Sequence, residues 1–162
     1  MKSKSFFIIL TLLIIGSLGV YYLFEAGFYP VAVVDSKLIG AKRFQESVVS
    51  AAHYYSQAAE TYKPDESFDS SLIVRELRRA TLDKLINDSL VYKELNHELG
   101  NDLENLVQSK INLLSLNIPN LEEAVKVLYG LTFEKFEKIV LIPRAREEIF
   151  IDRIALKNSD LE

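Results

Sequence analysis

An uncharged run of 19 residues near the N-terminus, residues 6–24, constrains this chain more than any other feature. As an α-helix the run is about 28 Å long, close to the roughly 30 Å hydrocarbon core of a bilayer. Lys2 and Lys4 precede it and Glu25 follows it, so the positive-inside rule leaves the N-terminus in the cytoplasm. We therefore predict that residues 1–29 form a single-pass anchor in the cytoplasmic (inner) membrane. The rest of the chain then faces the periplasm or the cell exterior.

A cleaved signal peptide is the alternative interpretation of the same run. Its apolar core is then residues 6–15, and Ser17-Leu18-Gly19 has the small-x-small pattern of a cleavage site. The apolar run continues through residues 20–24 beyond that site, as membrane spans do, which favours a retained anchor. Both interpretations export the remaining chain. A buried core helix is disfavoured, because a helix of this length in a small soluble domain normally has a polar face.

Charge and cysteine content exclude several classes of function for the exported part. The whole chain has a net charge of −4, and the exported part lacks the two N-terminal lysines and is more acidic still. Such a surface repels a phosphate backbone, so we expect no nucleic-acid partner. Cysteine is absent, which excludes disulfides, thiol nucleophiles and cysteine-bearing zinc sites.

The pattern after residue 29 predicts a small, mainly α-helical domain over residues 30–156 and a polar tail over residues 157–162. Residues 30–39 contain two short apolar runs around the polar pair Asp35-Ser36, which is typical of a β-hairpin. Helical spacing follows from residue 41 onward. Apolar stripes then recur over residues 44–62, 103–114, 121–128 and 133–154.

Local signals mark the ends of the later helices. Asn120 with Glu123 has the spacing of a capping box, and Thr132 is placed to cap the last helix. Pro143 lies inside that last helix and lacks the N–H group that would bond the carbonyl of Ile139, which predicts a kink.

The longest predicted helix covers residues 72–99 and ends before Gly100. Its main apolar arc includes Leu85 and Leu95, while Leu82, Ile86 and Leu90 form a second stripe on the opposite side. A helix that is apolar on two sides needs cover on two sides. We therefore predict a small helical bundle around this central helix, with a short N-terminal β-hairpin and a preceding transmembrane helix.

Three segments in this order resemble the N-terminal domain of the SurA family. They are the hairpin VAVVDSKLIGAKRF, the central LDKLINDSLVYKELNHELG and the later GLTFEKFEKIVLIPRAREEI. The resemblance covers about residues 30–156. It implies a helical, extracytoplasmic chaperone module that binds unfolded or exported polypeptide and needs no cofactor.

In that family the helical domain accompanies a parvulin domain that isomerises X-Pro bonds. Only eight residues follow Ile154, so we expect the isomerase to be absent from this chain. Two alternatives stay open. The chain is the N-terminal portion of a parvulin-type peptidyl-prolyl isomerase whose catalytic domain lies outside it, or it is an assembly protein for one fixed partner.

Aromatic side chains are the candidates for contact with a client polypeptide. Tyr54 lies off the apolar stripe of its helix, and alanines nearby leave shallow grooves that suit loose recognition of apolar segments. Core packing is the other interpretation of any single aromatic residue. The candidates are Tyr54, Tyr55, Tyr62, Phe68, Phe133 and Phe136.

The sequence predicts no catalytic, cofactor or metal site. His53 and His97 are far apart, and His97-Glu98 lacks the second histidine of a metalloprotease helix. Lys84 and Asp88 have the spacing of a helix ion pair rather than of a catalytic acid.

Two basic clusters stand out in this acidic chain. One comprises Arg75, Arg78 and Arg79, and the other comprises Arg144 and Arg146. We interpret both as solvated helix faces, and contact with anionic lipid headgroups is the alternative.

Overall fold

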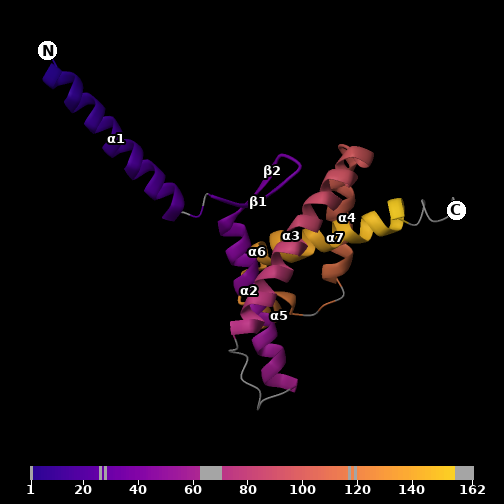
Figure 1. Ribbon diagram of the computed structural model, residues 1–162. Coiled ribbons are helices and arrows are strands. Elements are labelled where there is room, and N and C mark those ends of the chain that lie inside the picture. The colour runs from indigo at the N-terminus through magenta and orange to yellow at the C-terminus, as the bar shows by residue number, and fades with distance from the viewer. Residues whose placement is uncertain are drawn as a thin grey trace. The chain divides into compact units, whose positions relative to one another are not determined.

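The computed structural model describes residues 2–25, 27, 29–62, 71–116, 118 and 120–155. Over these residues the chain is mainly α-helical with one short antiparallel hairpin, which confirms the predicted fold class (Figure 1). The chain divides into two compact units, Met1–Gln45 and Glu46–Glu162.

The first unit contains the apolar helix α1 (Lys2–Glu25). Its segment Phe6–Glu25 is long and apolar enough to cross a bilayer, and the side chains of this segment are exposed on every face of the helix. A helix that is apolar all round is suited to lipid on all sides. The predicted N-terminal helix, long and apolar enough to cross a membrane, is therefore present.

The hairpin pairs β1 (Pro30–Val34) with β2 (Lys37–Gly40). Asp35 and Ser36 connect the strands with φ values of 50° and 70°. Two consecutive left-handed residues are what a two-residue type I′ turn requires, and after glycine it is short polar residues such as Asp that adopt this conformation. The hairpin predicted around this pair is confirmed.

The second unit is a set of helices, and those from α3 onward pack around one apolar core. The first helix, α2, crosses the unit boundary and contributes no residue to that core. In α3 Leu95 is fully buried, and it packs in one cluster with Val107 of α4 and Val125 of α5. The helices are α2 (Ala41–Tyr62), α3 (Ser71–Leu99), α4 (Asp102–Leu116), α5 (Leu121–Tyr129), α6 (Phe133–Phe136), the π-helix η1 (Glu137–Leu141), α7 (Ile142–Phe150) and the π-helix η2 (Ile151–Ala155).

Helix α3 is the long central helix that the sequence predicts, but its second stripe is covered only in part. Leu82 and Ile86 are half-buried, whereas Leu90 is 47% exposed. Both α4 and α7 contact α3, and the core that they share with it includes Val91 and Leu95 on its main arc. The expectation of full cover on two sides is therefore wrong at Leu90.

The helix-start signals gave one correct and one incorrect prediction. The hydroxyl of Thr132 accepts a hydrogen bond from the backbone N–H of Lys135, so the predicted cap is confirmed. Asn120 has a φ of 55° and its side chain makes no capping bond. An N-cap side chain reaches its N–H from an extended backbone, so the left-handed conformation prevents the capping box.

The kink at Pro143 stays a prediction, and the structure places the π-helix η1 directly before the helix α7 that contains this proline. The N–H of Ile142 donates to the carbonyl of Glu137, five residues back, directly before the proline that cannot donate. A wider π turn next to a proline is one of the recognised ways in which a helix accommodates the missing bond.

Gly130 joins α5 to α6 with a φ of 65°, and an added Cβ there would lie 3.3 Å from Cδ2 of His53. We expect Gly130→Ala to cost about 1 kcal/mol from left-handed backbone strain, with a further loss from this close contact. Gly100→Ala is the matched control, because Gly100 has a φ of 52° and open space around it. Urea unfolding followed by circular dichroism measures both, and equal losses would show that the His53 contact costs nothing.

Candidate functional site

The candidate site is a hollow of about 200 Å³ between α2, α3 and η1, which we call the tyrosine cavity. Helix α2 contributes residues from its middle, α3 contributes one face, and η1 closes the hollow with two aliphatic side chains. The lining residues are Ser47, Ser50, Ala51, Tyr54, Tyr55, Thr81, Lys84, Leu85, Asp88, Tyr129, Ile139 and Val140.

Two contacts hold α2 against the rest of the second unit at this place. Nε2 of His53 lies 3.0 Å from the carbonyl oxygen of Val127 in α5. Nζ of Lys135 in α6 lies 3.1 Å from a carboxylate oxygen of Glu46. His53 therefore has a structural role between two helices.

Small residues on α2 make room for the cavity. Ser47 and Ser50 are the buried positions of the helix within this unit, and with Ala51 and Tyr54 they follow the i, i+3, i+4, i+7 spacing of one helix face. The sequence instead predicts the stripe over residues 44–62 as the apolar face. That prediction is wrong at Tyr55, which is 51% exposed. The face with the small residues Ser47 and Ser50 is the buried one, because small side chains let α2 approach the neighbouring helices closely.

Aromatic rings form a continuous series at one side of the cavity. The rings of Tyr54 and Tyr129 stack, with centroids 5.1 Å apart and planes at 20°. Tyr55 meets Tyr54 edge-on, with centroids 5.9 Å apart, and Phe136 packs against Tyr129 at 4.8 Å. Burial raises the pKa of the Tyr129 phenol, and nearby Tyr54 raises it further, so Tyr129 stays uncharged at neutral pH.

The predicted aromatic residues occupy different environments. Tyr54 and Tyr55 line the cavity and are 39% and 51% exposed. Phe136 is buried in the core, and Phe133 is half-buried against the same core. Phe68 and the side chain of Tyr62 lie outside the described residues.

Tyr129 and the two residues of η1 are functional candidates that sequence reasoning missed. Tyr129 lies 75 positions after Tyr54, and no local pattern signals a pair at that separation. The small-residue face of α2 is the one signal that could have located the hollow.

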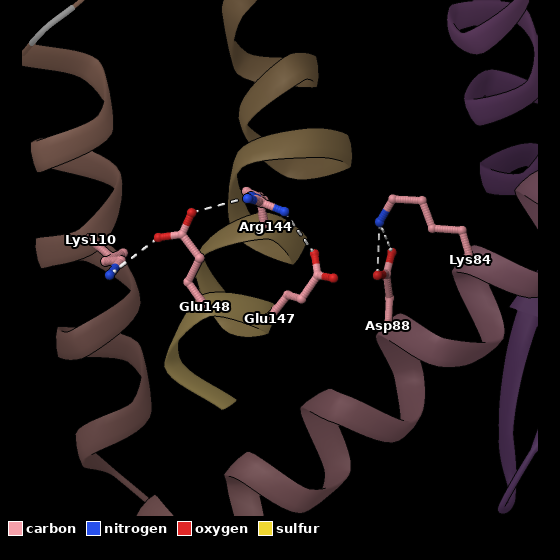
Figure 2. A network of polar contacts seen from close by, with 6 residues as sticks. All are labelled: Lys84, Asp88, Lys110, Arg144, Glu147 and Glu148. Carbon is pink, nitrogen blue, oxygen red and sulfur yellow. Dashed lines mark hydrogen bonds and ion pairs between the residues drawn. The ribbon is translucent and has the colours of Figure 1, made fainter. Parts of the chain in front are cut away.

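Three of the polar side chains that line the cavity have a hydrogen-bond partner within α3. The hydroxyl of Thr81 donates to the carbonyl of Leu77 at 2.8 Å. Lys84 donates to both carboxylate oxygens of Asp88 at 2.9 and 3.0 Å, which confirms the predicted helix pair (Figure 2). The buried hydroxyl of Ser47 has no hydrogen-bond partner. It is the polar atom most in need of a bond from a bound molecule.

A separate charged network links α4 to α7 away from the cavity lining. Figure 2 shows Glu148 between Lys110 and Arg144, at 3.2 Å from each. Lys110 also lies 3.3 Å from Asp152. Hydrogen bonding to Glu148 raises the pKa of Lys110. The Lys110 pairs connect α4 to α7 and η2, and ion pairs at the protein surface usually contribute little to stability.

Among the described residues, one exposed group on α3 has the ligand types of a metal site. Donor atoms of Glu94, His97 and Glu98 lie within 4.8 Å of one another. All three residues are exposed on consecutive turns of one helix, so no second element fixes their geometry.

A second hollow of about 370 Å³ lies beside the tyrosine cavity, and we call it the α2–α3 groove. Tyr55 belongs to both hollows. The first turns of α3 form the rest of the groove with Leu72, Ile73, Glu76, Leu77 and Ala80.

Comparison of the chain with known protein families, curated proteins and solved structures finds no match.

Proposed function

We propose that this chain is a membrane-anchored, extracytoplasmic chaperone-like module that holds unfolded or exported polypeptide. The tyrosine cavity is the single observation that carries the proposal. It is an open hollow with aromatic and aliphatic walls next to two exposed tyrosines. The apolar helix α1 supports the anchor, and the resemblance to the SurA N-terminal domain supports the chaperone class.

The dimensions of the cavity suit one large apolar side chain of a client. An apolar cavity of about 150 Å³ is large enough to hold benzene, and the tyrosine cavity measures about 200 Å³. Unfolded polypeptide displays such side chains without a fixed order, and tyrosine walls favour tolerant contact with them.

Filling the cavity provides the test. We expect the full chain in lipid nanodiscs to suppress light scattering by a denatured, aggregation-prone protein in stoichiometric amounts, because binding lowers the free client concentration. Ala51→Phe places a ring in the cavity and should remove most of this protection. Val49→Phe is the control, since Val49 lies on the same helix, is 62% exposed and does not line the cavity.

Three results would contradict the proposal, once circular dichroism has shown that the variants are folded. Equal protection by Ala51→Phe and Val49→Phe would exclude the cavity as the client site. Catalysed X-Pro isomerisation by the chain would favour the isomerase alternative, because the uncatalysed reaction takes tens of seconds or more and is easily followed. Capture of one partner in fixed ratio, without protection of unrelated clients, would favour the assembly protein.

A further inference from the structure

The first turns of α3 form a basic amphipathic segment, residues 72–80, that stands out from the rest of the second unit. Its large apolar residues Leu72, Ile73 and Val74 are 60%, 41% and 41% exposed. Arg75, Arg78 and Arg79 are exposed as well. Large apolar residues that are exposed next to one another mark an interaction surface, whereas single exposed apolar residues scattered over a protein do not.

The two kinds of side chain lie on opposite sides of the helix. At about 100° per residue, the apolar residues span an arc of about 200° that runs from Leu72 to Val74. The remaining arc holds the three arginines, whereas Glu76 lies within the apolar arc beside Leu72 and lines the α2–α3 groove with it. An apolar face opposite an arginine-rich face is the pattern of a helix that lies in the plane of a membrane surface.

Charge identifies the surface that this segment fits. The segment contains three arginines and one glutamate, whereas the chain as a whole has a net charge of −4. Basic side chains close to an anionic bilayer each strengthen binding about fivefold. Binding of an unfolded polypeptide would use the apolar arc, but it would not explain why three arginines lie beside that arc.

We propose that the basic amphipathic segment docks on the surface of a bilayer that contains anionic lipids. The apolar arc enters the boundary between headgroups and acyl chains to a depth of about 5–10 Å, and the arginines contact the phosphates. The same chain carries α1, which can span a bilayer. This tether raises the effective concentration of the segment at the membrane, so a modest intrinsic affinity is sufficient.

The chain contains no tryptophan, so Leu72→Trp provides a single fluorescent probe in the full-length protein. The protein is placed in nanodiscs made either of phosphatidylcholine alone or with phosphatidylglycerol, each with brominated acyl chains that quench nearby tryptophan. We expect quenching and a blue shift in the anionic nanodiscs and neither in the neutral ones. Leu116→Trp is the control, because Leu116 is 80% exposed at the end of α4 and should not be quenched.

Charge removal tests the role of the arginines. In the Leu72→Trp background, Arg75→Gln and Arg79→Gln should each lower the ratio of docked to undocked protein about fivefold. Val74→Trp serves as a second probe if Leu72→Trp disturbs the helix, which circular dichroism detects. Quenching that is equal in neutral and anionic nanodiscs, or unchanged by both arginine substitutions, would overturn the proposal.

The competing occupant of this surface is a client polypeptide, because Leu72 and Ile73 also line the α2–α3 groove. A blue shift that appears only when denatured client is added, whatever the lipid charge, would assign the surface to clients and overturn membrane docking. If Arg75→Gln and Arg79→Gln lose the quenching but keep client protection, membrane docking of this segment is a property separate from client binding. The proposed chaperone function can therefore fail or hold independently of this result.

Discussion

Replacing Leu95 with aspartate is expected to unfold the second unit of this protein. Leu95 is 0% exposed near the C-terminal end of α3 and packs in the core that α3 shares with α4, α5 and α7. Burying an unpaired carboxylate there costs several kcal/mol, which is comparable to the whole stability of about 5–15 kcal/mol of an ordinary domain. Far-ultraviolet circular dichroism of the full chain in detergent, with increasing urea, should show no cooperative transition for this unit.

Leu90→Asp is the matched control for that experiment. It makes the same chemical change five residues earlier on the same helix, where the leucine is 47% exposed. Surface substitutions usually change stability by about 0.5 kcal/mol or less, so cooperative unfolding should be retained. Unchanged unfolding of Leu95→Asp would contradict the core described above. Loss of folding in Leu90→Asp would show that the second stripe is covered after all, as its sequence pattern suggests.

Leu90 also illustrates how much of the fold the sequence can predict. Periodicity correctly identified the hairpin and the long central helix, because turn chemistry and amphipathic spacing act over a few neighbouring residues. The pattern shows which positions are apolar, but it does not show how many neighbouring helices exist to cover them. Leu90 and Leu95 look alike in the sequence, and they differ only because α4 and α7 pack over the arc that contains Leu95.

The candidate site was predictable only where it depends on one helix. Tyr54 and Tyr55 could be selected because they stand at a known place on α2 beside small residues. Their partner Tyr129 and the two residues of η1 arrive from the C-terminal half of the chain. The π-helix also changes which side chains face the cavity, because its wider turn shifts the register relative to an α-helix. The long-range pairing leaves no local sequence signal. Pro143 signals an irregular helix, but it does not show which side chains the irregularity turns toward the cavity.

Phe136 separates the two interpretations of a predicted aromatic residue, namely core packing and client contact. Its side chain is 6% exposed, belongs to the core and packs against Tyr129. Phe136→Ala is therefore expected to lower the free energy of unfolding by about 3–5 kcal/mol, because it removes a buried ring and leaves a cavity. Urea unfolding by circular dichroism measures this loss.

Phe133→Ala is the control, since Phe133 lies three residues earlier in the same helix and is only half-buried. Its loss of stability should be clearly smaller, because less of its surface leaves water on folding. Tyr129 stacks on Tyr54, so the cavity that Phe136→Ala creates also removes support from the wall of the tyrosine cavity. Client protection should therefore fall in Phe136→Ala even at temperatures where the variant remains folded. Unchanged stability with reduced protection would instead mean that Phe136 contacts the client directly. It would contradict the role in core packing that its burial indicates.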